Sequence, residues 1–207
     1  MTPLPGAGQR WPHTGAILAG GQSRRMGRPK EGVTLWDGRP MIEHVIEPLA
    51  ALCRRVVIVG ACPGFRVDPG RGIIRLADRS PGQGPLAGIE TLLASGLDSG
   101  YLIVACDQPL LTPHRLRPLL RDGDPAVPRF FRAQDGAELD PFPGYLPAAW
   151  LPMVRDALAR DQRSVRALVR RTRVTWVSIP NVLRPDLRNV NTPADLAGLP
   201  SLCRASL

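Results

Sequence analysis

The sequence predicts a single three-layer α/β domain, in which helices cover both faces of a mostly parallel β-sheet. The chain has 207 residues, which is enough for one large hydrophobic core and short for two domains. Apolar residues make up 43% of the chain and charged residues 22%, the balance of an ordinary globular protein. Short apolar runs alternate with segments of helical periodicity, as in proteins built from β-α units.

Seven short runs are the predicted strands. Residues 56–59 are all Val or Ile, and a continuous β-branched run is typical of a strand that is buried on both faces of a parallel sheet. Residues 101–105 form a second run of this buried kind. The predicted strands are residues 15–18, 56–59, 73–76, 101–105, 126–131, 144–148 and 174–179.

Helices are predicted between these strands. In residues 40–52, apolar side chains recur at spacings of four, four and three from Met41 to Leu52, which is the period of an amphipathic helix. Pro48 is expected to kink or shorten this helix, because proline removes a backbone hydrogen bond. Further helices are predicted at residues 85–95, 149–160 and 163–172, after Thr112-Pro113 and, as a short final helix, after Thr192-Pro193.

The ends of the chain fall outside the predicted domain, which spans residues 14–200. Residues 1–13 are rich in Pro and Gly and lack periodicity, so they are expected to form a flexible tail, as are residues 201–207. We see no apolar segment of a secretory signal near the start and no run of the ~20 apolar residues that a membrane helix requires. The four cysteines form no C-x-x-C pair. A cytoplasmic protein without a membrane partner is therefore expected.

The net charge of +9 predicts affinity for anions. Of the 27 basic residues only Lys30 is a lysine. The arginines are scattered and aromatic residues are only 5% of the chain, so no stacking platform for nucleic acid is visible. The densest basic run, residues 163–173, is interpreted as the solvent-exposed face of an amphipathic helix. We do not expect a nucleic-acid partner, although a non-catalytic anion- or nucleic-acid-binding domain remains an alternative.

A glycine-rich segment follows the first predicted strand, where parallel sheets bind their ligands. Its sequence, residues 18–30, is LAGGQSRRMGRPK. The glycines let backbone N–H groups approach a ligand closely, and successive N–H groups form an anion-binding concavity. Arg25 and Lys30 add positive charge, so the segment has the chemistry of a triphosphate cradle. It is neither a Walker A loop nor a dinucleotide fingerprint, and a plain turn with solvated arginines is the alternative.

Four segments, in chain order, resemble the motifs of the molybdenum cofactor nucleotidyltransferases. Residues 18–30 resemble L-A-G-G-x-S-x-R-M-G-x-x-K, and residues 78–89 resemble an acidic residue followed by P-G-x-G-P-L-x-G. Residues 105–109 are similar to a C-D-x-P motif, and residues 189–196 to N-V-N-T-P-x-D/E-L. The resemblance extends from residue 15 to about residue 197. It implies the Rossmann-like nucleotidyltransferase fold of the NTP-transferase superfamily.

The resemblance also implies a reaction, namely magnesium-dependent guanylyl transfer. The terminal phosphate of molybdopterin, with or without molybdenum, would attack the α-phosphorus of GTP and release pyrophosphate. Such a displacement requires positioning and charge stabilisation more than covalent catalysis. The second glycine of L-A-G-G favours guanine, whereas cytidylyl-transferring relatives tend to have L-A-A-G. A molybdopterin cytidylyltransferase, or a relative with another phosphorylated acceptor, remains the alternative. Implied partners are GTP, molybdopterin and, transiently, molybdoenzymes or accessory cofactor-biosynthesis proteins.

Residue roles follow from the same resemblance. Lys30 and Arg25 are expected to stabilise the phosphates, and Asp107 to hold Mg²⁺, a cation that takes oxygen ligands. The alternative for Asp107 is a carboxylate that caps a turn. Asn189 and Asn191 are expected to contact the acceptor, with turn hydrogen bonding as their alternative. The expected nucleotide contacts are Leu18, Ala19, Gly20, Gly21, Lys30, Asp78, Gly84, Pro85 and Asp107.

Two segments depart from the family's pattern. Residues 56–61 lack the asparagine that relatives often carry after the second strand. Residues 139–145 lack the H-P run that usually precedes a later strand. The nucleotide contact of that asparagine is therefore expected to be missing or supplied by the backbone. The departure at residues 139–145 leads us to expect that the pterin side of the site differs from that of relatives.

Overall fold

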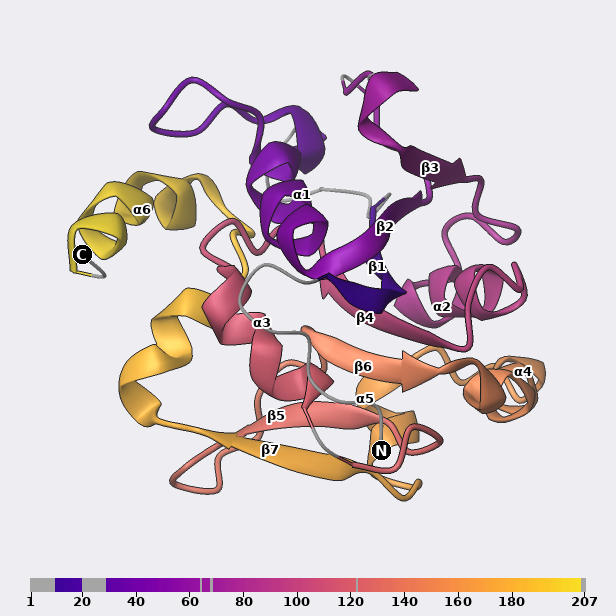
Figure 1. The fold of residues 1–207 in the computed structure, drawn as a ribbon. Coiled ribbons are helices and arrows are strands. Elements are labelled where there is room, and N and C mark those ends of the chain that lie inside the picture. Colours follow the sequence, from indigo (N-terminus) through magenta and orange to yellow (C-terminus); the bar gives the residue numbers. More distant parts are fainter. Residues whose placement is uncertain (1–9, 20–28, 64, 68, 122, 206–207) are drawn as a thin grey trace.

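The computed structural model describes residues 10–19, 29–63, 65–67, 69–121 and 123–205. Within these residues, seven strands form one sheet in the order β3-β2-β1-β4-β6-β5-β7 (Figure 1). They are β1 (Trp11–Leu18), β2 (Cys53–Val59), β3 (Ile73–Leu76), β4 (Gly100–Ala105), β5 (Arg129–Ala133), β6 (Gly144–Pro147) and β7 (Thr175–Ile179). Only β6 runs against its neighbours, β4 and β5, and the other pairs are parallel. The predicted mostly parallel sheet is confirmed.

Helices cover both faces of this sheet. The α-helices are α1 (Met41–Leu52), α2 (Pro85–Leu93), α3 (Pro113–Leu120), α4 (Leu151–Ala159), α5 (Val165–Val169) and α6 (Pro193–Ala205). In the described part of the chain four 3₁₀ helices accompany them: η1 (Lys30–Gly32), η2 (Pro69–Arg71), η3 (Ala148–Trp150) and η4 (Asn181–Leu187). In Figure 1, α1 and α3 lie on the viewer's side of the sheet and α6 projects at the left.

Two hydrophobic cores, one on each face, hold the three layers together. Leu102 and Val104 of β4 pack with α1 and α3, whereas Tyr101 and Ile103 pack with α2, α4 and α5. Successive side chains of a strand point to opposite faces, so β4 contributes to both cores. All four of these side chains are 0% exposed, and each such burial contributes about 1.5–3 kcal/mol. The alternation explains why β4 is a continuous apolar run.

Several boundaries differ from the predicted ones. β1 begins at Trp11, because Trp11 pairs with Cys53 of β2, so the last three residues of the predicted tail 1–13 belong to the sheet. α6 extends to Ala205, into the predicted tail 201–207. α5 is shorter than the predicted helix over residues 163–172.

Pro48 was expected to kink or shorten α1, and the expectation of a shorter helix was wrong. The helix continues through Pro48 to Leu52. Pro48 is buried on the apolar face of α1, together with seven other residues of the helix. We attribute the tolerance to this burial, because the packed apolar face stabilises the helix more than the one lost backbone hydrogen bond destabilises it.

A small third cluster joins the end of the chain to the segment after residue 29. Val33, Leu35 and Met41 pack with Val190 and with Leu199 of α6. This packing brings the chain before α6 close to η1, at one edge of the sheet. Within the described residues, no helix is long and apolar enough to cross a membrane.

Candidate active site

The carboxyl ends of four adjacent parallel strands, β3, β2, β1 and β4, lie at one level. Leu18 of β1 pairs with Val59 of β2 and with Ala105 of β4, and Val59 pairs with Leu76 of β3. The segments that follow these residues therefore emerge side by side. A pocket of about 650 Å³ opens at this edge of the sheet. A parallel α/β sheet binds its ligands in this position.

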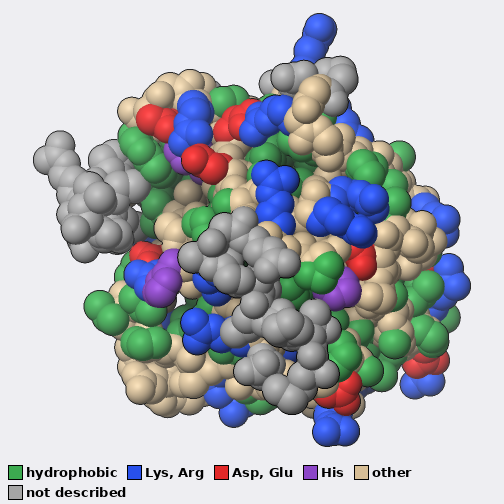
Figure 2. All heavy atoms as spheres, in the orientation of Figure 1, with side chains coloured by type: hydrophobic (Ala, Val, Ile, Leu, Met, Phe, Trp, Pro, Cys, Tyr) green, Lys and Arg blue, Asp and Glu red, His purple; other side chains and the backbone are tan. Residues whose placement is uncertain are grey.

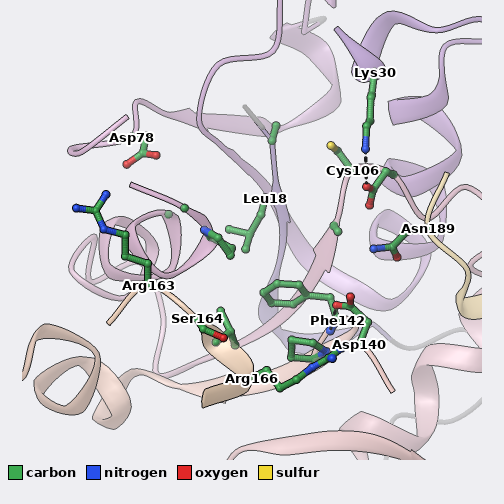
Figure 3. Close-up of a pocket in the computed structure, with 18 of the residues that line it drawn as sticks. Leu18, Lys30, Asp78, Cys106, Asp140, Phe142, Arg163, Ser164, Arg166 and Asn189 are labelled. Atoms are coloured by element: carbon green, nitrogen blue, oxygen red, sulfur yellow. Dashed lines mark hydrogen bonds and ion pairs between the residues drawn. The ribbon is translucent and has the colours of Figure 1, made fainter. Parts of the chain in front are cut away.

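Residues from separate parts of the chain line this pocket. Figure 3 shows Asp78 and Arg163 at one end of it and Lys30, Cys106 and Asn189 at the other, with Leu18 between them. The lining residues predicted from the sequence are Leu18, Ala19, Lys30, Asp78, Gly84, Pro85, Asp107 and Asn189. Three further predicted residues, Gly20, Gly21 and Arg25, lie outside the described residues.

Lys30 joins two of the predicted site residues. It begins η1, and its Nζ donates to Oδ2 of Asp107 at 3.1 Å and to Oδ1 of Asn191 at 2.5 Å. The side chains of Lys30 and Asp107 are each only 13% exposed. Their attraction is therefore stronger than that of a surface ion pair, which water screens. Asn191 does not line the pocket directly but reaches it through Lys30.

Two oxygens next to this ion pair are buried and have no hydrogen-bond partner among the described residues. They are Oδ1 of Asp107 and Oδ1 of Asn189. The backbone N–H of Val190 donates to the carbonyl oxygen of Asp107 at 2.8 Å. The segments that carry Asp107 and Asn189 are therefore hydrogen-bonded to each other. Buried polar atoms in native proteins are nearly always paired, and unpaired oxygens in a pocket are suited to receive a ligand.

The segment that carries Asn191 is fixed by a cap at the start of α6. Oδ2 of Asp195 accepts from the backbone N–H groups of Asn191 and Thr192, at 3.0 and 2.9 Å. The hydroxyl of Thr192 accepts in turn from the N–H of Asp195 at 3.1 Å. This reciprocal arrangement satisfies backbone donors at the helix start. It holds Asn191 in reach of Lys30.

Asp78 is held at the opposite end of the pocket. Its Oδ1 accepts from the backbone N–H of Ser80 at 3.0 Å and from the hydroxyl of Thr91 at 3.4 Å. Gly84 precedes α2 with a φ of 83°, a conformation that favours glycine. A Cβ at Gly84 would lie 3.7 Å from Arg163, so the loop before α2 runs close to the chain before α5.

The structure adds pocket residues that were not predicted from the sequence, among them Asp140, Phe142, Arg163, Ser164 and Arg166. Arg163 and Arg166 are exposed, as interpreted for the basic run 163–173, but both also line the pocket. The departure of residues 139–145 from the family pattern was the one sequence signal near Asp140 and Phe142. The pKa of Asp140 is raised above its ordinary value, mainly because burial at the pocket wall removes the carboxylate from water. The backbone hydrogen bond from Phe142 and the charge of Arg166 oppose this increase, and the charge of Asp107 adds to it.

Cys106 lines the pocket but is not a reactive nucleophile. Burial, followed by the negative charge of Asp107, raises the pKa of its thiol well above the ordinary value. The thiol therefore stays protonated at neutral pH, and a protonated thiol is a poor nucleophile. Cys106 thus acts as a small hydrophobic residue in the wall of the pocket.

A second cavity, of about 600 Å³, adjoins the first. Asp140, Phe142 and Asn189 line both cavities. The second cavity is otherwise lined by Leu139, Asn181, Arg184, Pro185, Leu187, Arg188 and Asn191. Two ligands bound in the two cavities would thus meet at Asn189 and Phe142.

Basic side chains do not gather into one patch on the face drawn in Figure 2. Among the described residues, Lys and Arg side chains there are interspersed with hydrophobic and uncharged atoms. Many arginines also pair with carboxylates, for example Arg71 with Glu43 and Arg155 with Glu90. A continuous basic surface is the expected footprint of a nucleic-acid-binding protein, and this face does not provide one.

Known proteins resemble the chain over most of its length. Residues 15–175 match the family model described as MobA-like NTP transferase domain. A probable molybdenum cofactor guanylyltransferase of Deinococcus radiodurans is 34% identical over 197 residues, which cover 91% of this chain and 94% of that protein. Another, of Pelotomaculum thermopropionicum, is 33% identical over 194 residues, 88% of this chain and 89% of that protein.

A solved structure supports the fold. Molybdopterin-guanine dinucleotide biosynthesis protein A from Archaeoglobus fulgidus superposes with a TM-score of 0.73 at 23% identity, covering 93% of this chain and all of that one. The nucleotidyltransferase fold predicted from the sequence motifs is therefore confirmed.

Proposed function

The chain belongs to the MobA-like NTP transferase family, and from this premise we propose that it transfers GMP from GTP to the terminal phosphate of molybdopterin. The products are molybdopterin guanine dinucleotide and pyrophosphate. The observation that carries the proposal is the enclosed pair of Lys30 and Asp107 at the ligand-binding edge of the sheet. Oδ1 of Asp107 and Oδ1 of Asn189 are buried there without a partner among the described residues. These groups suit the charge of a reacting phosphate.

We assign the first cavity to GTP, with its base toward Asp78 and its phosphates toward Lys30. Guanine presents N–H donors that a carboxylate accepts, and Oδ1 of Asp78 is already oriented by Ser80 and Thr91. Leu18, Ala19, Gly84 and Pro85 contact the nucleotide along its length in this assignment. The remaining assigned contacts to the phosphates are Gly20, Gly21 and Arg25.

Lys30 has a proposed role at the reacting phosphate. Its ammonium, now bonded to Asp107 and Asn191, exchanges one of these contacts for a phosphate oxygen when GTP binds. A compact ammonium with three donors can bond a phosphate and a carboxylate at the same time. Lys30 thereby orients the α-phosphate for attack and stabilises the charge that develops on it.

The residues present also fit Mg²⁺. No three His, Cys, Asp or Glu side chains of the described chain lie close enough to hold a metal together, but Mg²⁺ is bound by one or two protein oxygens plus waters and phosphates. Asp107 would hold the ion, and the unpartnered amide oxygen of Asn189 would be a second ligand. A bound Mg²⁺ supplies neutralisation of phosphate charge.

We assign the second cavity to molybdopterin. Asn189 and Asn191 line it, as do Arg184 and Arg188, which suit a phosphorylated acceptor. Because this cavity meets the first at Asn189, a terminal phosphate in one cavity can reach the α-phosphorus in the other. A cytoplasmic location and transient contacts with molybdoenzymes or accessory proteins complete the proposal.

The test is nucleotide selectivity with Mg²⁺, measured with and without molybdopterin. We expect pyrophosphate release that requires GTP, molybdopterin and Mg²⁺ together, and that stops when the metal is chelated. Pyrophosphate release from CTP but not from GTP would instead identify a cytidylyltransferase. Salt-sensitive DNA or RNA binding, without any transfer, would identify an anion-binding domain.

Two aspartate variants test whether Asp107 takes part in the transfer. Asp107→Ala should reduce turnover at least about 100-fold, because the ligand of the cation and the partner of Lys30 are both lost. Asp156→Ala is the matched control, since Asp156 lies on α4 with a side chain that is 58% exposed. Normal turnover by Asp107→Ala would refute the metal assignment.

A further inference from the structure

Gln108 is a buried polar residue that the proposed reaction does not yet use. It directly follows Asp107 and is 0% exposed. Its side-chain Oε1 accepts from the backbone N–H of Ala105 at 3.2 Å. Its Nε2 donates to the carbonyl oxygens of Phe142 at 2.8 Å and Leu187 at 3.1 Å. One side chain thus joins three segments of the chain.

The chemistry of the partners fixes the orientation of this amide. A backbone N–H can only donate and a backbone carbonyl can only accept. A flipped amide would direct NH₂ at the N–H of Ala105 and oxygen at two carbonyl oxygens. Gln108 is therefore held in one orientation, and both of its N–H bonds are used.

Each of the three segments borders the site. Ala105 ends β4, immediately before Cys106 and Asp107. Phe142 lines both cavities, and Leu187 lines the second one. The backbone bond from Val190 to Asp107 adds a second tie between the same segments. Gln108 therefore connects the turn that carries Asp107 with two walls of the second cavity.

The nucleotide end of the first cavity is held by other bonds. Ala19 donates to Val59 in the neighbouring strand, and Asp78 is oriented by Ser80 and Thr91. Gln108 bonds none of these residues. Loss of the Gln108 amide should thus loosen the second cavity and leave the base-binding end of the first cavity in place.

We propose that Gln108 is a positioning residue for the acceptor, which holds the walls of the second cavity at a fixed place relative to Asp107. The identity of the acceptor rests on the proposed function, whereas the coupling of the two walls does not. Loss of a residue that holds ligand-binding groups in position typically changes affinity or activity by 10–100-fold. The acceptor's KM should rise by about this factor, and the KM for GTP should change less than about twofold.

Two variants separate the contacts of Gln108. Gln108→Met has a similar volume and removes all three bonds. Gln108→Glu retains an acceptor for Ala105 but places carboxylate oxygen against the carbonyls of Phe142 and Leu187. Gln134→Met is the matched control, because Gln134 is exposed at the end of β5. We expect both Gln108 variants to raise the KM for molybdopterin and the control to behave as wild type.

Hydrogen exchange followed by mass spectrometry provides a readout that does not depend on activity. In the Gln108 variants, exchange should accelerate in residues 139–143 and 186–190 and stay unchanged in residues 15–19 and 86–93. A uniform acceleration, or equal changes in the KM values of both substrates, would show a merely structural role and overturn the proposal.

The wild-type protein supplies a measurement that remains decisive if the variants do not fold. Segments that open together exchange with a common free energy. Residues 139–143 and 186–190 of the wild type should therefore lose protection together as urea is added, and independent loss would refute the coupling. If wild-type protein shows this coupling but no transfer from GTP to molybdopterin, the proposed function fails while the role of Gln108 stands.

Discussion

Replacement of Lys30 by arginine tests whether shape matters at the reacting phosphate as much as charge does. The substitution keeps the net charge of +9. Nζ of Lys30 lies 2.5 Å from Asn191 and 3.1 Å from Asp107, in a side chain that is only 13% exposed. A planar guanidinium is larger than an ammonium and directs its donors differently, so it cannot repeat both contacts in this enclosed space.

The expected size of the effect follows from the contacts of Lys30. Removal of a donor that stabilises a transition state costs about 10²–10³ in kcat. Lys30→Met, which is similar in length and uncharged, should show this full loss. Lys30→Arg retains the charge but not the geometry, and it should lose at least about tenfold, or about 1.4 kcal/mol of transition-state stabilisation.

The assay is pyrophosphate release from GTP in the presence of Mg²⁺ and molybdopterin. Thermal unfolding of each variant checks that a loss of activity is not a loss of folding. Arg160→Lys is the reciprocal control, because Arg160 directly follows α4 with a side chain that is 68% exposed, and it should tolerate the exchange. Wild-type kcat/KM in Lys30→Arg would refute the argument that this position requires a lysine.

Packing, capping and charge each give one further prediction. Gly144→Ala would place a Cβ 2.7 Å from the buried Phe130 ring, so it should cost about 1–3 kcal/mol and lower Tm by about 2–4 °C for each kcal/mol. Thr112→Ala removes the side-chain cap of α3 and should cost about 1 kcal/mol in urea unfolding, with unchanged turnover. Burial alone would raise the pKa of Asp98, but the hydrogen bond with His13, followed by bonds from neighbouring groups, holds it below its ordinary value. The ionised Asp98 carboxylate therefore stabilises the folded protein at a pH above the pKa that Asp98 has in the unfolded chain. This stabilisation is lost as the pH falls through the lower pKa that Asp98 has in the folded protein. Asp98→Asn should therefore be less stable than wild type at pH 7, and the difference should narrow below pH of about 4; a constant difference down to pH 3 would contradict this assignment.

Much of the fold could be predicted because local patterns determine it. β3 occupies the predicted residues 73–76, and the cap at Thr112 begins α3 as expected. The start of β1 could not be predicted, because Trp11 joins the strand through its pairing with Cys53, 42 positions away (53 − 11). Long-range pairing of this kind leaves no trace in local composition.

The site was predictable only where the strands are parallel. Asp78 and Asp107 follow β3 and β4, and both line the pocket. Phe142 precedes β6 instead of following it. Because β6 is antiparallel to β4, and Gly144 pairs with Ile103 near the end of β4, the residues before β6 reach the ligand-binding edge. Nothing in the sequence indicates that this one strand is reversed.

Arg163 and Arg166 were missed for a different reason. Arg163 precedes α5 and Arg166 lies on it, and the basic pattern indicates that both side chains are exposed but not what lies opposite them. The approach of Gly84 to Arg163 depends on how two crossover connections pack on the same side of the sheet. Helical periodicity predicts which residues are exposed, but it does not distinguish open solvent from the mouth of a pocket.

The bond between Lys30 and Asn191 also bears on when the protein acquires its site. The two residues are 161 positions apart, so the contact closes one of the longest loops in the fold. Contacts of high sequence separation form late, because the entropy of loop closure must be overcome first. During synthesis, β1 to β4 emerge from the ribosome long before Asn191 does. A nascent chain can therefore pair β1 to β4 while Lys30 still lacks its amide partner. Completion of this bond would make the proposed phosphate site one of the last parts of the molecule to mature.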